Sequence, residues 1–230
     1  MSEKPPKLGA VADTEAFAGS DAAQARVRRW WRLVPRVLTA PREVFVALRD
    51  DDEVDVEARA EPILAIVMLA GMAGILLTPA WGTVLDEQSL DWLVLAVITF
   101  IGGLFYGVAG YFLLGLAVWL GIRGVGLETS ARRCRQLLGF SSVPLALSLL
   151  VTLPVALVAF GPDFFRSGGG DAGWGHRLVV ALGLGFAVWS LVLLALGLRV
   201  TYRLAWQGVA GTLALATVLV GTLAVLPGVL

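Results

Sequence analysis

Residues 92–121 read WLVLAVITFIGGLFYGVAGYFLLGLAVWLG, thirty positions without a single Lys, Arg, Asp or Glu. A helix needs about 20 apolar residues to cross the hydrocarbon core of a bilayer, and each charge at its centre would cost roughly 2.5 to 3.5 kcal/mol. Four further uncharged runs lie at 62–80, 137–160, 178–198 and 207–229. The five runs predict an all-α, polytopic membrane protein whose five transmembrane helices form one bundle over 62–230.

Composition supports this class. The chain is 57% hydrophobic and 16% charged, with a mean hydropathy of +0.80, whereas soluble domains carry about a quarter of charged residues. Its one cysteine, Cys134, excludes an intramolecular disulfide and a thiolate zinc cluster. We interpret it as an ordinary cytoplasmic thiol. We expect no cofactor, no metal ion and no nucleic acid.

Basic residues predict the orientation of the bundle. Ten Lys or Arg precede residue 62, four lie in 122–136 and two in 199–206, whereas the intervening loops hold only Arg166 and Arg177. Because basic residues near spans stay in the cytoplasm, the N-terminus is predicted inside and the C-terminus outside. Sixteen Arg against two Lys, with no Asn, indicate a GC-rich bacterial genome and hence a bacterial cytoplasmic membrane.

The segment before the first span is predicted to be a cytoplasmic arm. Residues 1–20 resemble a disordered tail, and 21–61 hold amphipathic helices followed by the acidic run DDDEVDVE, interpreted as a solvated spacer. A first helix would carry Trp30 and Trp31 opposite a basic face made of Arg28, Arg29, Arg32 and Arg36. A second is predicted to start at Pro41 and to bury Val44, Phe45 and Leu48.

Two interpretations of this arm remain open: it lies in the membrane interface, or it docks on the cytoplasmic ends of the bundle, since both need the same amphipathic pattern. The tryptophans and arginines of the arm, together with Arg132, Arg133 and Arg135, are candidate contacts for anionic lipid or for a protein partner.

Small residues spaced four apart are predicted to let the helices approach closely, at Ala70 and Gly74, Gly103 and Gly107, Ala117 and Gly121, and Gly183 and Ala187. The same stripes leave room for a homo-oligomer. The second run would be about 45 Å long as a straight helix, so we expect it to tilt, to bend at Gly102–Gly103, or to protrude.

Mid-span polar residues are expected to form a hydrogen-bonded layer inside the bundle, made of Tyr106, Ser148, Trp189, Ser190 and Thr217. In the third run, Pro144 and Pro154 free the carbonyls of Phe140 and Leu150, which neighbouring helices or local side chains such as Ser148 and Thr152 are expected to satisfy. Ser141 and Ser142 are predicted to bond backward to carbonyls of their own helix.

Residues 123–147 contain RGVGLETSARRCRQLLGFSSVPLAL, in which Gly139-Phe140 precedes Pro144-Leu145. This pattern resembles the bacterial branch of the Yip family, the Ypt/Rab-interacting membrane proteins. The resemblance implies a five-span bundle with a cytosolic N-terminus. Eukaryotic relatives engage small GTPases, but their Asp-Leu-Tyr-Gly-Pro element is absent and only Glu61-Pro62 stands there, so Rab binding is not transferred.

These observations favour a non-enzymatic scaffold that organises membrane or recruits a partner through a basic cytoplasmic face. No pairing of serine with histidine, and no pair of carboxylates, lies within a span, which argues against an intramembrane enzyme. The alternative is a small transporter or channel for a neutral solute or lipid. Ion coupling is disfavoured because the spans hold no ionisable carboxylate, amine or imidazole.

Overall fold

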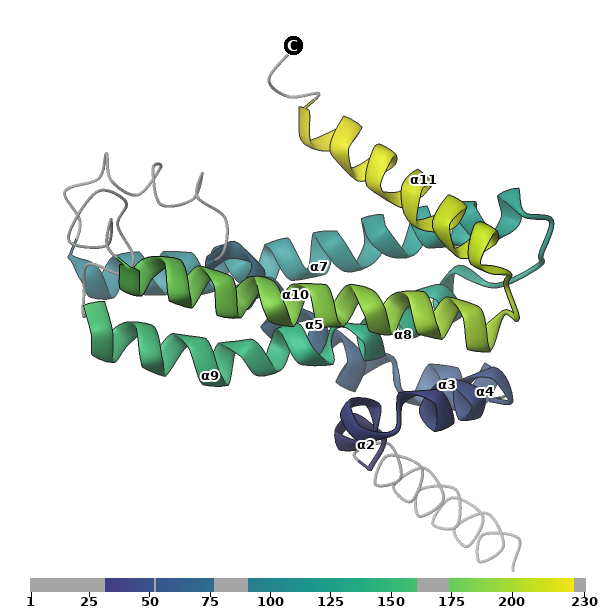
Figure 1. Ribbon diagram of the computed structural model, residues 1–230, viewed down its shortest axis with the longest axis horizontal. Coiled ribbons are helices and arrows are strands. Elements are labelled where there is room, and N and C mark those ends of the chain that lie inside the picture. Colours follow the sequence, from purple (N-terminus) through teal and green to yellow (C-terminus); the bar gives the residue numbers. More distant parts are fainter. Residues whose placement is uncertain (1–31, 52, 77–90, 161–173, 226–230) are drawn as a thin grey trace, which may run out of the picture.

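The computed structural model describes residues 32–51, 53–76, 91–160 and 174–225, and every regular element in those ranges is a helix. Three short helices come first, α2 (Leu33–Thr39), α3 (Pro41–Arg49) and α4 (Glu53–Ala58). The longer helices are α5 (Ala60–Leu76), α7 (Trp92–Gly124), α8 (Ala131–Ser141), α9 (Val143–Phe160), α10 (Trp174–Thr201) and α11 (Trp206–Val225). Figure 1 shows the long helices as a bundle, with α2–α4 beneath one end.

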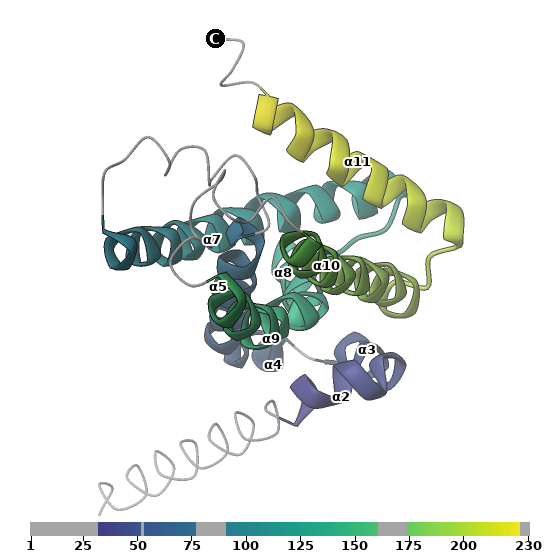
Figure 2. The ribbon, with the colours of Figure 1, turned by 60° about the vertical axis from the view of Figure 1, so that its left-hand side comes forward.

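Four segments of the described chain are long and apolar enough to cross a membrane, namely Asp55–Leu76, Leu93–Gly124, Ala131–Val158 and Arg177–Thr201. They overlap the first four predicted runs, so the all-helical membrane class is confirmed. The fifth run falls in α11, whose side chains beyond Val218 lie outside the described residues. Figures 1 and 2 show α11 diverging from the bundle while it contacts α7 and α10. The count of five spans therefore stays a prediction.

Helix α7 is the long axis of the bundle. Its 33 residues correspond to about 50 Å at 1.5 Å per residue. The helix continues through Gly102–Gly103 without interruption, and it packs against α5, α8 and α11 along its length. Because the hydrocarbon core is only about 30 Å thick, a helix of this length must tilt in the membrane or extend beyond it.

Helices α5 and α7 cross at three glycines. A Cβ atom added to Gly71 would collide with the backbone of Gly103 and Gly107, and one added to Gly103 would lie 2.6 Å from the Cα of Met72. Lipid supplies little hydrophobic force between helices, so such backbone proximity and its dispersion contacts hold them together. Gly103 and Gly107 are one of the small-residue pairs that were predicted to allow close approach of helices. On α5, however, the crossing uses Gly71, because a Cβ on Gly74 would meet only the Tyr106 ring, at 3.4 Å.

The predicted third span consists of two helices, since α8 ends at Ser141 and α9 begins at Val143. Pro144 occupies the second position of α9, where a missing N–H costs little. The N–H of Leu145 instead donates to Oγ of Ser190 on α10, at 3.1 Å. A serine from another helix thus satisfies one of the orphan donors that every helix start carries.

The hydroxyls of this segment bond to carbonyls one turn back. Ser141 donates to the Leu137 carbonyl and Ser142 to that of Gly139, both at 2.8 Å, which confirms the backward bonding predicted for them. Ser148 donates to the Leu145 carbonyl and Thr152 to the Ser148 carbonyl, both at 2.6 Å. Those two hydroxyls therefore do not bond to the carbonyls of Phe140 and Leu150, so of the two expected sources neighbouring helices remain.

Helix α3 fixes the segment before the first span to the bundle. It begins at Pro41 and buries Val44, Phe45 and Leu48, as predicted. It packs on α10, where Thr201 Oγ1 donates to the Phe45 carbonyl at 3.3 Å. Residues 33–49 thus contact the bundle. Most of the helix predicted to carry Trp30 and Trp31, and the tail 1–20, lie outside the described residues.

Substitution Gly71→Ala should lower the free energy of unfolding by about 1–3 kcal/mol, because its methyl group would force α5 away from α7. The matched control is Gly110→Ala on α7, where an added Cβ meets no atom within 4 Å. Thermal unfolding of the purified protein in detergent measures both variants. Equal melting temperatures for the two would contradict the proposed crossing.

Substitution Ser190→Ala should destabilise the protein by about 1 kcal/mol, since the Leu145 N–H at the start of α9 would lose its acceptor. Thr217→Ala is the control, because Thr217 is exposed and donates to the carbonyl of Leu213 in its own helix at 2.9 Å. The same unfolding measurement applies. A Ser190 variant as stable as the parent protein would show that the bond contributes nothing.

Candidate functional site at the arginine-rich end

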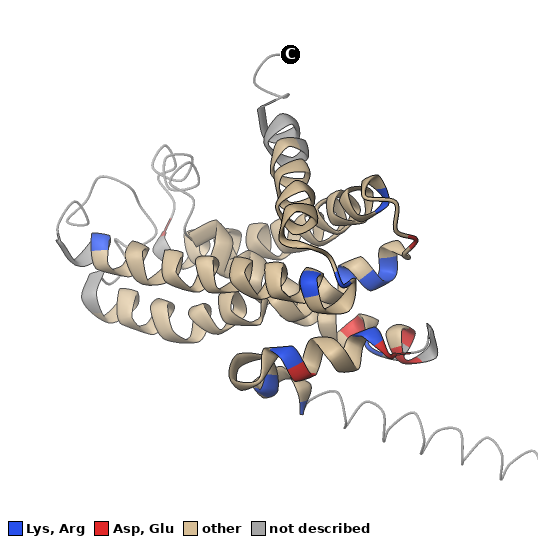
Figure 3. Cartoon of the chain, turned by 45° about the vertical axis from the view of Figure 1, so that its right-hand side comes forward, with Lys and Arg blue, Asp and Glu red and all other residues tan. Residues whose placement is uncertain are grey.

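The charged side chains gather at one end of the molecule. Figure 3 shows basic (blue) and acidic (red) residues on α2–α4, on α8 and where α7 and α10 end. The long apolar stretches of the helices are tan, because they carry no charged residue. Two charged residues lie at the opposite end, where α7 and α10 start (Figure 1): Asp91 at the N-cap of α7 and Arg177 in the first turn of α10. Two arginines at the charged end stack on tryptophans: Arg123 lies 4.9 Å from the Trp119 ring centre and Arg199 lies 4.4 Å from that of Trp206.

The acidic run is part of this charged end and is not the spacer that the sequence predicted. Residues Glu53–Ala58 form α4, and Val56 within it is buried. Arg59 forms a two-point ion pair with Asp51, and both side chains are nearly buried, at 13% and 10% exposure. Arg133 Nη2 donates to the Asp51 carbonyl at 2.9 Å. Arg133 of α8 thus anchors the segment that precedes α5.

Capping hydrogen bonds fix both ends of the loop between α7 and α8. Helix α7 ends in a Schellman motif, in which the N–H of Gly126 donates to the Arg123 carbonyl at 2.9 Å and that of Leu127 to the Ile122 carbonyl at 3.3 Å. Gly126 has φ +86°, a left-handed conformation that favours glycine. Ser130 then caps α8 by accepting from the N–H of Arg133 at 3.3 Å.

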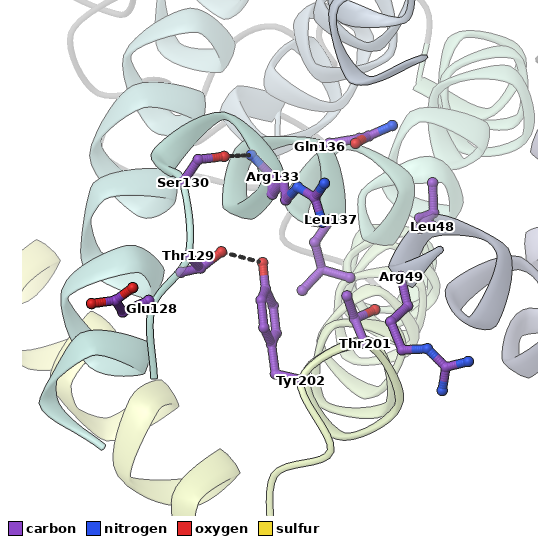
Figure 4. Close-up of a pocket in the computed structure, with 10 residues that line it drawn as sticks. All are labelled: Leu48, Arg49, Glu128, Thr129, Ser130, Arg133, Gln136, Leu137, Thr201 and Tyr202. Carbon is purple, nitrogen blue, oxygen red and sulfur yellow. Dashed lines mark hydrogen bonds between the residues drawn. The ribbon is translucent and has the colours of Figure 1, made fainter. Parts of the chain in front are cut away.

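This loop forms one wall of a cavity of about 520 Å³, a volume typical of small-molecule sites. The cavity is lined by Leu48 and Arg49 of α3, loop residues 128–130, Arg133, Gln136 and Leu137 of α8, and Thr201 and Tyr202 at the end of α10. Figure 4 shows these side chains, with Thr129 and Tyr202 joined by a hydrogen bond. Four segments that are distant in sequence therefore meet here.

The wall formed by Thr129 and Tyr202 is held in place from two sides. Trp119 Nε1 donates to the Thr129 carbonyl at 3.0 Å, and the Thr129 hydroxyl donates to Oη of Tyr202 at 3.2 Å. The Cys134 sulfur lies 3.6 Å from the same Oη. Burial, and after it the neighbouring Cys134 thiol, raises the pKa of Tyr202 well above its usual value. Tyr202 therefore remains a neutral phenol that can donate a hydrogen bond.

The charges that line the cavity are two arginines and one carboxylate. Arg49 is engaged by Asp50 through hydrogen bonds of 2.8 and 3.2 Å, and these lower the pKa of the Asp50 carboxyl. Glu128 is exposed on the loop. Among the described residues, no group of three His, Cys, Asp or Glu side chains is placed to hold a metal ion.

One lining residue has an unsatisfied donor. Gln136 is 4% exposed, and its Nε2 has no hydrogen-bond partner among the described residues. A buried amide donor without a partner costs roughly 1–3 kcal/mol. Nothing in the sequence marks Gln136, Thr129 or Tyr202 as functional, because each is an ordinary polar residue beside a span. The one available signal is that Gln136 is a polar residue directly before the apolar run 137–160.

The residues predicted to contact lipid or a partner do not form one surface in the described part of the chain. Arg28, Arg29, Trp30 and Trp31 lie outside the described residues. Arg32 is exposed. Arg132, also exposed, lies 3.8 Å from Glu57, a surface pair that contributes little stability. Arg133 lines the cavity.

Arg135 points to a different surface, toward α7. Its guanidinium lies 4.8 Å from the Phe112 ring centre and 5.8 Å from that of Tyr111. Gly115 makes room for it, because a Cβ at that position would collide with the Arg135 side chain. Arg133 and Arg135, two residues apart on one helix, therefore do not act on one ligand at the cavity.

The structure does not bring the predicted mid-membrane polar residues together. Tyr106 and Trp189 are 56% and 38% exposed. Ser148 and Thr217 donate to carbonyls of their own helices. Ser190 accepts from the Leu145 N–H of α9. These residues make separate local contacts and form no common layer.

The Gly139-Phe140 and Pro144-Leu145 motif surrounds the junction between α8 and α9. A Cβ on Gly139 would collide with Ile63 of α5, so this glycine allows close approach of α8 and α5. Phe140 is fully buried. The motif thus determines how α8 joins the bundle, and its contacts are structural.

Comparison with known proteins identifies the family of the chain. No curated protein and no solved structure matches the chain. The family model for the Yip1 domain matches residues 36–226, a range that begins in α2 and ends just after α11. Since this match covers most of the 230 residues, the chain belongs to the Yip1 family.

Proposed function

We propose that this protein is a non-enzymatic scaffold of a bacterial cytoplasmic membrane, which binds anionic lipid and recruits a partner protein through its arginine-rich end. The observation that carries the proposal is the segregation of charge along the bundle (Figure 3). Apart from Arg177, the described arginines lie at or near the end where α2–α4 dock. Each juxtamembrane arginine contributes about 1 kcal/mol toward an anionic bilayer surface.

The same segregation supports a five-span topology with the N-terminus in the cytoplasm and the C-terminus outside. α7 ends and α8 begins at the charged end, and α10 and α11 are joined there as well (Figures 1 and 3). Helix α11 has 20 residues, enough to cross a bilayer. The arginine of the short link before it, Arg203, is exposed, which fits a cytoplasmic link.

The exposed arginines of α2 and α3 support the lipid-binding part of the proposal. Arg32, Arg36 and Arg42 are exposed, while the apolar faces of the two helices pack inward. Because α3 is fixed to α10, these cations are presented in a constant arrangement. A preformed basic surface loses less entropy on binding than a flexible arm would.

Topology is tested by reporter fusions. Alkaline phosphatase fused after Leu230 should be active, because that enzyme folds only outside the cytoplasm, whereas green fluorescent protein at the same site should stay dark. Fusions after Gly126 should give the opposite pattern and serve as the control. A fluorescent fusion after Leu230 would leave four spans and overturn the proposed orientation of the C-terminus.

Combined substitution of Arg32, Arg36 and Arg42 by Gln should reduce the preference for anionic over zwitterionic lipid by roughly fivefold per arginine. Mass spectrometry of lipids that co-purify in mild detergent measures this ratio. Arg177→Gln, which removes an arginine at the other end, should leave it unchanged. If both variants retain the parent lipid ratio, the basic end does not select anionic lipid.

A further inference from the structure

We propose that Arg135 of α8 binds the phosphate of one phospholipid, whose acyl chain lies along the exposed face of α7. The ligand is a bilayer lipid of the leaflet at the arginine-rich end, and its phosphate is the group that the site recognises. Arg135 is not among the residues that line the cavity described above. The inference assigns a defined lipid site to the arginine-rich end and so rests on the proposed function of that end.

The first argument is that the charge of Arg135 has no anionic partner in the described part of the chain. There it makes no hydrogen bond and no ion pair. Its guanidinium instead lies against two aromatic rings of α7, with centres 4.8 Å away for Phe112 and 5.8 Å away for Tyr111. A ring attracts a cation but neither neutralises it nor accepts its in-plane N–H groups. Arg59, by contrast, pairs with the Asp51 carboxylate.

The terminal amino groups of Arg135 are the donors that a ligand can reach. The Nε atom is buried without a partner, so it does not face the surroundings. The side chain as a whole is only half-buried, and its Nη1 and Nη2 groups extend beyond Nε. A guanidinium binds two oxygens of a phosphate through a pair of N–H groups, which gives strong, charge-assisted hydrogen bonds.

The second argument is the level of Arg135 in the bilayer. Helix α7 begins at Trp92, directly after the charged residue Asp91 at its N-cap. About 20 helical residues cross the hydrocarbon core, so a crossing that starts at Trp92 ends close to Tyr111 and Phe112. A typical tilt of about 20° adds only about one residue to this count. Because these two rings contact Arg135, its guanidinium lies where the hydrocarbon meets the phosphate layer.

The third argument is the apolar surface that continues from the guanidinium. Large exposed side chains follow one another along α7 toward its start, with exposed fractions between 48% and 73%: Phe112, Phe105, Ile101 and Val97. Spacings of four and seven residues place them on one face of the helix. Phe112 belongs both to this face and to the rings beside Arg135. A ligand that is anionic at one end and apolar along the rest fits this surface, and a phospholipid has that form.

The test titrates lipid onto the full-length protein in an uncharged detergent. The probes are phosphatidylglycerol and a diacylglycerol with the same acyl chains, which has no phosphate. Native mass spectrometry counts the bound lipid molecules and gives their affinities, and the shift in melting temperature is a second measure of binding. We expect phosphatidylglycerol to bind at least about tenfold more tightly than diacylglycerol.

Three variants test the residues named. Arg135→Gln removes the charge and should weaken the binding of one phosphatidylglycerol molecule roughly tenfold or more. Arg135→Lys keeps the charge but loses the paired donors, so it should retain part of that affinity. Phe112→Leu, at an exposed position, should weaken binding about two- to fivefold, because the guanidinium loses the ring that orients it. If Arg135→Gln fails to fold, the other two variants decide the matter.

Arg123→Gln is the matched control. Arg123 also stacks on an aromatic ring of α7, 4.9 Å from the centre of Trp119, so its removal costs the same kind of contact at the same end of the molecule. It lies about 16 Å further along α7 than Phe112, at 1.5 Å per residue, and so beyond the phosphate layer. This variant should bind phosphatidylglycerol within about twofold of the parent protein.

Three results would overturn the site: Arg135→Gln binds phosphatidylglycerol as tightly as the parent, diacylglycerol binds as tightly as phosphatidylglycerol, or Arg123→Gln weakens binding as much as Arg135→Gln. A dimer that dissociates in Arg135→Gln would assign this face of α7 to a second copy of the chain and would also overturn it. Each result leaves the proposed function standing, because the preference for anionic lipid is measured independently with the arginines of α2 and α3.

Discussion

The bilayer interior solvates neither ions nor unpaired backbone groups, and this constraint governs the rest of the molecule. It keeps the apolar runs 62–80, 92–121, 137–160 and 178–198 free of Lys, Arg, Asp and Glu. It also removes most of the hydrophobic force between helices, so the bundle depends on close contact. The crossing of α5 and α7 shows the consequence, because Gly71 and Gly107 bring two backbones together where any side chain would hold them apart.

The same constraint explains the junction between α8 and α9. A helix that restarts within an apolar segment exposes N–H groups that lipid cannot satisfy. Pro144 removes one such group by its chemistry, and Ser190 accepts another from Leu145. The junction is thus stabilised by a neighbouring helix, and it sets the direction in which α8 leaves the membrane-spanning part. That direction places Arg133 and Gln136 beside α3 and the end of α10.

Outside the apolar segments, charged side chains hold separate parts of the chain together. Arg59 and Arg133 bind opposite sides of Asp51, one at its carboxylate and one at its carbonyl, and so tie the segment before α5 to α8. The loop after α7 is fixed by its own capping motif and by Trp119. These contacts form the walls of the cavity, and Tyr202, which follows α10, is one of the lining residues. A raised pKa keeps the Tyr202 phenol neutral. Membrane anchoring and the candidate binding site therefore share the same helices.

The sequence by itself determined the membrane class, the uncharged segments, the clustering of arginines, the family motif and the buried face of α3. These follow from the identity of residues: charge cannot enter hydrocarbon, and an amphipathic helix such as α3 shows which face it buries, here Val44, Phe45 and Leu48. Only the tertiary structure decided that Gly71 faces α7, that Ser190 serves Leu145, and that the acidic run pairs with arginines. A helix that is apolar all round carries no sign of its rotation, and ion pairs between distant segments depend on where the chain returns.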